Sequence, residues 1–221
     1  KPYAPGDVLK LTFGLHATPV KPLPAGWRTF RIVTPWHKLL HSFIDNKAAS
    51  YKVITAVWPT WGKMQYYGFP APRNEGDFSA RLNSMWDKKI KPVPYMTPTC
   101  FSSAAPELEY YKAEWINPDF HDSNSQDVLQ LGAPLMNICP ESSSWRNFIS
   151  FKTKAFIDKY RLAGLYHDWA EVTPCRNREH GCGYEKDGVR HSTFPIFADR
   201  ELRKRIYCMA KEKDKDFLLI G

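Results

Sequence analysis

The sequence predicts an α/β fold with parallel strands, namely the first half or slightly more of a (β/α)8 TIM-type barrel. Short apolar segments typical of strands alternate about five times with segments in which apolar residues recur at helical spacing. Alternation of this kind builds βαβ units, whose strands are parallel. No glycine-rich nucleotide-binding motif follows a predicted strand, so a barrel is favoured over a nucleotide-binding open sheet.

Each expected strand is short, apolar and rich in β-branched or aromatic residues. The expected strands are 29–33, 51–58, 90–96, 162–166 and 217–220. The expected helices are 36–44, 78–86, 145–160 and 202–210. Serines 142–144 are expected to cap the third helix. Residues 98–140 are rich in Pro, Ser and Asn and are expected to form a long irregular insertion.

The chain is expected to contain two unequal parts. Residues 1–24 combine an alternating segment at 7–16 with a proline-rich segment, which we interpret as the end of an all-β domain followed by a stiff linker. Residues 25–221 are expected to be the N-terminal part of the catalytic barrel, truncated at its C-terminus, because the last residues resemble the start of a strand.

Composition and charge exclude several function classes. The hydrophobic content of 43% supports a real core. The net charge is +8, but Lys and Arg are scattered apart from a cluster at 200–215 that we assign to the exposed face of a helix, so no nucleic-acid partner is expected. No apolar segment is long enough to span a bilayer.

The most informative residues follow the expected strand at 162–166. The carboxyl ends of parallel barrel strands converge on the face that holds the active site. Asp168 and Glu171 lie at such an end and are the candidate catalytic residues, since glycoside cleavage needs a proton donor and a group that stabilises an oxocarbenium-like centre. In the structural alternative, Asp168 caps a turn and Glu171 is solvated. Tyr166 and His167 are expected to point away from Asp168.

Aromatic residues near the other strand ends are candidates for substrate binding, because flat rings stack on sugar faces. These candidates are Trp36, Trp58, Trp61, Tyr95 and Tyr184. The alternative is that they are ordinary hydrophobic core.

The five cysteines are an odd number for a disulfide framework. Cys175 and Cys182 have three possible states: a disulfide, free thiols, or a zinc site completed by His180 and His191, although the spacing matches no standard zinc finger. The remaining cysteines, expected to be buried free thiols, are Cys100, Cys139 and Cys208. No cofactor is expected.

Two motifs resemble glycoside hydrolase family 123. Residues 13–24, Phe-Gly-Leu-His-Ala-Thr-Pro-Val-Lys-Pro-Leu-Pro, followed by Trp27-Arg28, resemble the junction between its β-sandwich and its barrel. The second motif is Gly164 through Asp168, then Cys175-x-Asn177-x-x-His180-Gly-Cys-Gly-Tyr184, then Arg200-Glu-Leu202. The resemblance covers nearly the whole chain.

The resemblance implies a barrel behind a β-sandwich and hydrolysis of a β-linked N-acetylhexosaminide by attack of the substrate's own acetamido group. In this family an Asp orients the acetamide and the Glu after it protonates the leaving oxygen. Asp168 matches the Asp, but Trp169 stands where the Glu should follow, and Glu171 is two residues further on.

Three functional hypotheses follow. The first is a glycoside hydrolase with a carbohydrate substrate and a periplasmic or extracellular location. The second is a carbohydrate-binding protein of the same fold that has lost its catalytic pair. The third is a zinc-stabilised binding module.

Overall fold

The computed structural model describes residues 53–58, 64–66, 68–122, 133–169 and 171–221, together with positions 4–6, 8, 10, 13–15, 28 and 30–33. The helix expected at 36–44 and the domain boundary near residue 24 lie outside the described residues. The described positions within the expected strand at 7–16 are in no strand.

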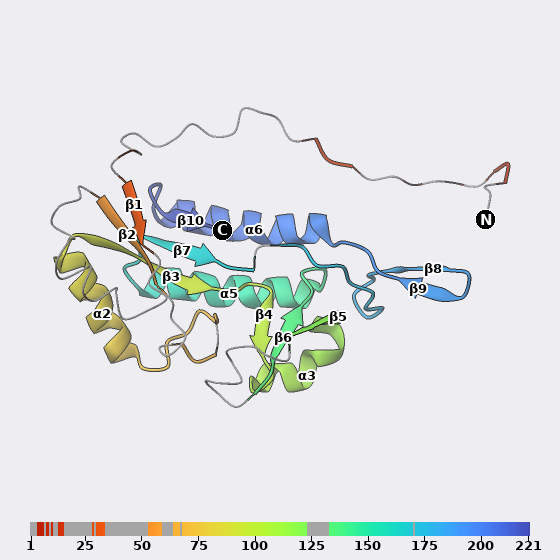
Figure 1. Cartoon of the computed structure of the whole chain (residues 1–221), viewed down its shortest axis with the longest axis horizontal. Helices are drawn as coiled ribbons and strands as arrows, with labels where there is room; N and C mark the ends of the chain where they lie inside the picture. Colours follow the sequence, from red (N-terminus) through yellow and green to blue (C-terminus); the bar gives the residue numbers. More distant parts are fainter. Residues whose placement is uncertain are drawn as a thin grey trace.

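Five parallel strands form the main sheet (Figure 1). In chain order they are β1 (Phe30–Val33), β2 (Val53–Trp58), β3 (Ile90–Met96), β7 (Gly164–His167) and β10 (Leu218–Ile220). Their order across the sheet is also β1-β2-β3-β7-β10, and every neighbouring pair is parallel. The predicted α/β class, with its parallel sheet, is therefore confirmed.

Three helices cover one face of this sheet: α2 (Glu75–Asp87), α5 (Ser143–Lys159) and α6 (Ile196–Lys213). Asn74 caps α2 and Ser142 caps α5, each accepting a hydrogen bond from a backbone N–H three residues on. All three helices contribute to one buried cluster with residues of β3 and β7. Its members include Phe78, Leu82, Ile90, Met96, Phe156, Ile157, Leu165 and Ala210.

Successive residues of β3 and β7 face opposite sides of the sheet. Ile90, Met96 and Leu165 pack in the cluster shared with the helices. Tyr95 and Tyr166 pack in a different cluster, with Trp169. The face of the sheet opposite α2, α5 and α6 thus carries Tyr95, Tyr166 and the position two residues after Tyr166.

The insertion between β3 and α5 is folded, so the expectation of an irregular segment at 98–140 is wrong for its described part. It contains β4 (Cys100–Ser102), α3 (Pro106–Trp115), β5 (Ile116–Asp122) and β6 (Leu135–Ile138). The strands form an antiparallel sheet in the order β4-β6-β5. A buried aromatic cluster fastens it to α5: Trp145 lies 5.0 Å from Trp115 and 5.3 Å from Phe101, between ring centroids.

A hairpin of β8 (Tyr184–Lys186) and β9 (Val189–His191) follows β7. Asp187 and Gly188 both have positive φ, as its tight turn requires. Figure 1 shows the insertion and the hairpin on the side to which the arrows of β3 and β7 point. Among the described residues, no helix is long and apolar enough to cross a membrane.

Candidate functional site

Asp168 follows the last residue of β7 and is held by two phenols. Tyr95 Oη donates a hydrogen bond to its Oδ2 at 2.9 Å, and Tyr166 Oη donates to its Oδ1 at 3.3 Å. The two rings meet edge to face with centroids 5.5 Å apart. The backbone N–H of Asp168 donates to the carbonyl of Met96, which continues the β3–β7 pairing. Asp168 is only partly buried.

The prediction that Tyr166 points away from Asp168 is wrong. Residues two apart in a strand share a face, so Tyr166 and Asp168 lie together while His167 lies opposite. Trp169, directly after the acid, has a φ of 55°. This left-handed conformation is uncommon for a bulky residue and turns the chain sharply at the strand end. Thr99 Oγ1 donates to the Trp169 carbonyl at 3.2 Å and supports the turn.

In the described part of the chain, the structure does not bring the other predicted catalytic and substrate-binding residues together with Asp168. Glu171 is exposed. Tyr184 lies in the β8–β9 hairpin, is 50% exposed, and stacks on His191 with centroids 5.2 Å apart. Trp36 and Trp61 lie outside the described residues, and the side chain of Trp58, the last residue of β2, is not described.

A cavity of about 580 Å³ lies on the helix side of the sheet. It is bounded by the ends of β7 and β10 and by α6, and its lining includes His167, Asp199, Arg200 and Arg203 but not Asp168. Asp199 and Arg203 form an ion pair at 2.7 Å. The cavity therefore belongs to the helix-packing layer and is separate from the tyrosine-flanked carboxylate.

His167 is buried beside this cavity, and its Nε2 makes no hydrogen bond. Burial, together with the charge of Arg203, lowers the pKa of His167 to about 4. In the unfolded chain its pKa is near 6.5, so the unfolded state binds the extra proton first and stability falls as the pH drops from about 6.5 to about 4. The loss from this group alone is about 3 kcal/mol.

The variant His167→Leu is expected to remove this part of the pH dependence. Denaturant unfolding of both proteins at pH 7 and at pH 4.5 measures it. The gap in unfolding free energy between variant and wild type should shift in favour of the variant at the lower pH. If the unfolding free energies of the two proteins change by the same amount between pH 7 and pH 4.5, His167 is not buried in its neutral form.

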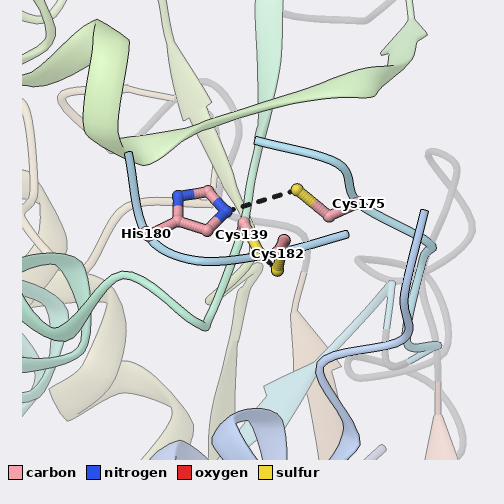
Figure 2. Close-up of side chains that lie close together, drawn as sticks. All are labelled: Cys139, Cys175, His180 and Cys182. Atoms are coloured by element: carbon pink, nitrogen blue, oxygen red, sulfur yellow. Dashed lines mark hydrogen bonds between the residues drawn. The ribbon is translucent and has the colours of Figure 1, made fainter. Parts of the chain in front are cut away.

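Three cysteines and one histidine gather beyond the end of β7 (Figure 2). Cys139 follows β6, and Cys175, His180 and Cys182 come from the loop between β7 and β8. The four potential ligand atoms all lie within 4.8 Å of one another. His191 is not among them, so Cys139 takes the place that we expected for His191. Cys175 and Cys182 are free thiols, which excludes a disulfide between them in this structure.

The environment of these groups favours a thiolate at Cys175. Hydrogen bonds from Cys139 and Cys182 hold the pKa of Cys175 well below its usual value. The pKa of Cys139 is raised, first because its thiol donates to Cys175. Burial lowers the pKa of His180, but hydrogen bonds to Cys175 and Cys182 outweigh burial and raise it to about 10. A thiolate at Cys175 and a protonated imidazole at His180 thus lie together in a largely buried cluster.

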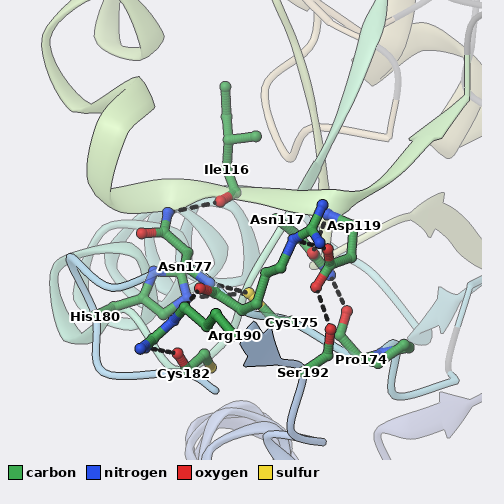
Figure 3. A network of polar contacts seen from close by, with 11 residues as sticks. Ile116, Asn117, Asp119, Pro174, Cys175, Asn177, His180, Cys182, Arg190 and Ser192 are labelled. Carbon is green, nitrogen blue, oxygen red and sulfur yellow. Dashed lines mark hydrogen bonds and ion pairs between the residues drawn. The ribbon is translucent and has the colours of Figure 1, made fainter. Parts of the chain in front are cut away.

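A polar network joins the β7–β8 loop to the insertion (Figure 3). Asn177 Nδ2 donates to the carbonyls of Ala113 and Ile116, at 2.7 and 2.9 Å. Asn117 Nδ2 donates to the Pro174 carbonyl at 2.9 Å. Asp119 accepts from Ser192 and pairs with Arg176, both at 2.6 Å. Arg190 donates to the backbone carbonyls of Arg176 and Cys182.

Sequence reasoning missed Tyr166 and Cys139 as parts of these sites. For Tyr166 the signal was present, because it is two residues from Asp168 on a strand. For Cys139 the signal was weak. It lies 36 positions before Cys175 along the chain (175 minus 139), and only the folding of the insertion brings it to the loop. Cys208, expected to be buried, is exposed on α6, while Cys100 is buried as expected.

The structure is similar to those of several carbohydrate-active enzymes. An α-galactosidase from Thermus thermophilus matches with a TM-score of 0.50 and 12% identity, over 86% of this chain and 38% of that one. An α-amylase from Geobacillus thermoleovorans matches at 0.50 and 14%, over 87% and 46%. A GH31 family sulfoquinovosidase from E. rectale matches at 0.51 and 11%, over 87% and 30%.

At these identities the likeness shows a shared fold. The chain spans less than half the length of each of these three enzymes. No curated protein sequence matches it. The family profile described as "Domain of unknown function (DUF6259)" matches residues 29–188, and the resemblance to glycoside hydrolase family 123 stays a prediction.

Proposed function

The chain belongs to the DUF6259 family, and we propose that it forms part of a glycoside hydrolase in which Asp168 is a catalytic carboxylate. One observation carries the proposal: the Asp168 carboxylate lies at the carboxyl end of a parallel strand and accepts hydrogen bonds from two tyrosines. In barrel enzymes this is where the chemistry takes place. The activities named for the structural neighbours support the same class of reaction.

The proposal includes the partial barrel. In a doubly wound sheet the strand order reverses and helices cover both faces. Here five strands follow one another across the sheet in chain order, and helices α2, α5 and α6 share one buried cluster. This arrangement supports a sheet that curls toward closure, with the face opposite α2, α5 and α6 inside. Tyr95, Tyr166 and Asp168 would then line the interior at the active-site end.

The contacts of Asp168 suit a side chain that acts directly on the anomeric centre. A carboxylate accepts hydrogen bonds at both oxygens, and Tyr95 and Tyr166 supply one to each. An ionised carboxylate facing an oxocarbenium-like centre either stabilises it or attacks it. We therefore assign Asp168 to this role instead of proton donation. Glu171 remains our candidate for the donor, from an exposed position that would have to close over the substrate.

A panel of nitrophenyl glycosides tests the proposal with the full-length protein. It should include α-galactoside, α-glucoside and β-N-acetylgalactosaminide, so that both the neighbours' linkages and the acetamido-assisted reaction are sampled. We expect release of nitrophenol from at least one of them, abolished by Asp168→Asn. Hydrolysis of the acetamido sugar alone would support substrate assistance.

The alternative is a carbohydrate-binding protein without catalysis. It is favoured by Trp169, which occupies the place of the proton donor expected from the family resemblance, and by the exposure of Glu171. Binding of a glycoside by calorimetry with no turnover of any panel member would select this alternative.

The phenol of Tyr95 is expected to contribute to catalysis by positioning Asp168. Tyr95→Phe removes the 2.9 Å hydrogen bond to the carboxylate. A hydrogen bond to a charged group contributes about 1.5–3 kcal/mol, so kcat should fall about 10- to 100-fold. Tyr160→Phe, on the helix side of the sheet, is the control and should keep wild-type kcat. Equal kcat values in the two variants would contradict the role of Tyr95.

A further inference from the structure

We propose that Cys139, Cys175, His180 and Cys182 bind one zinc ion, which cross-links the insertion to the loop that follows Asp168. The four groups form a compact set made of the ligand types that structural zinc prefers, three thiolates and an imidazole. Soft thiolate ligands also disfavour calcium and magnesium. The proposal depends on these side chains alone and does not require the chain to be a glycosidase.

The spacing of the ligand atoms fits a tetrahedral ion. With Zn–S bonds of about 2.3 Å, two sulfurs on a tetrahedron lie about 3.8 Å apart. Cys139 Sγ and Cys182 Sγ are 3.7 Å apart. With a Zn–N bond of about 2.1 Å, the sulfur-to-nitrogen edge is about 3.6 Å, and Cys175 Sγ lies 3.3 Å from His180 Nε2. Small adjustments of side chains would place an ion between them (Figure 2).

Neighbouring groups orient the ligands as metal sites require. His180 Nδ1 lies 2.5 Å from the backbone carbonyl of Glu114, which leaves Nε2 pointing at the cysteines. A ligating histidine commonly donates its second N–H to a carbonyl in this way. The backbone N–H of Asn177 donates to Cys175 Sγ at 3.5 Å, as suits a thiolate.

The backbone of the loop is shaped to present the ligands. Cys175 is fixed by two backbone hydrogen bonds to Thr193, at 2.8 and 2.9 Å. Gly183, next to Cys182, has a φ of 88°, and a Cβ there would lie 2.7 Å from the His191 carbonyl oxygen. Only glycine fits this position without displacing backbone. The turn that carries two of the four ligands is therefore held tightly.

The set is closed, so the ion would be structural. Four protein ligands satisfy tetrahedral zinc and leave no position for a reactive water. Cys139, Cys175 and Cys182 are nearly or wholly inaccessible, which shields the ion. The ion would stabilise the junction because its binding free energy is gained only when the insertion and the loop are folded together.

Metal analysis of the full chain, purified without added metal, tests the proposal. We expect about one zinc per chain in the wild type and in Cys208→Ser, which removes an exposed thiol from α6. Cys139→Ser and Cys175→Ser should hold less than about a fifth of that amount. If a variant does not fold, cobalt(II) exchanged into the wild type gives a second readout, the visible spectrum of a tetrahedral thiolate site.

Three results would overturn the assignment. The first is wild-type protein without stoichiometric zinc, or with iron or copper in its place. The second is octahedral cobalt(II), which would show that the cysteines are not ligands. The third is a Cys139–Cys182 disulfide in non-reduced protein, detected by mass after alkylation. Each is independent of glycoside turnover, so failure of the zinc site and failure of the glycosidase proposal can be told apart.

Discussion

Asp168→Asn is expected to lower kcat on the best glycoside by on the order of 10³-fold or more while leaving the fold intact. The amide has the shape of the carboxylate but carries no charge to stabilise an oxocarbenium-like transition state. It also presents a single acceptor oxygen, whereas Tyr95 and Tyr166 each donate to a different oxygen of Asp168. Steady-state kinetics of the full-length protein, with a thermal unfolding curve to verify folding, measure the effect.

The matched control is Asp199→Asn. Asp199 is also a buried carboxylate near the end of the sheet, but it lines the cavity on the helix side and pairs with Arg203. Its loss should lower stability and leave kcat within a few-fold of the wild type. If Asp199→Asn lowered kcat more than Asp168→Asn, the active site would lie in that cavity and the role assigned to Asp168 would be wrong.

Trp145→Ala is expected to have the largest effect on stability, a loss of about 3–5 kcal/mol in unfolding free energy. The indole is fully buried between Phe101 and Trp115, and its Nε1 donates to the Pro98 carbonyl at 2.9 Å. Truncation therefore leaves a cavity and an unpaired carbonyl where the insertion meets α5.

Denaturant unfolding compared with Phe151→Ala measures this effect. Phe151 lies on the same helix but is 69% exposed, so its loss should change the unfolding free energy by less than about 0.5 kcal/mol. Similar losses in the two variants would show that the insertion is not fastened through Trp145.

The main sheet could be predicted because local pattern decides it. β3 is buried along almost its whole length and is apolar apart from Lys91, and α2, α5 and α6 have apolar faces at helical spacing. The insertion could not be predicted in this way. Its strands β4 and β6 have only three and four residues, and α3 buries only two of its ten residues, so their stability comes from distant partners such as Trp145.

The candidate sites differ in the same way, because local pattern reveals some of their residues and only the fold brings the others together. Tyr95 and Asp168 were predicted because strand ends are visible in the sequence, and the structure joins them by a hydrogen bond. The proposed zinc ligands were predicted only in part, because His191 is nearer in sequence whereas Cys139 is nearer in space. The hairpin carries His191 into its stacking with Tyr184 instead.

A crystal structure of full-length Asp168→Asn, soaked with the glycoside that the wild type cleaves fastest, tests the central claim most directly. We expect the sugar on the face of the sheet opposite α2, α5 and α6, with its anomeric carbon about 3–3.5 Å from the residue 168 side chain and Tyr95 beside it. A sugar bound in the cavity beside His167 and α6, or anywhere out of reach of residue 168, would contradict the proposal that this carboxylate cleaves glycosides.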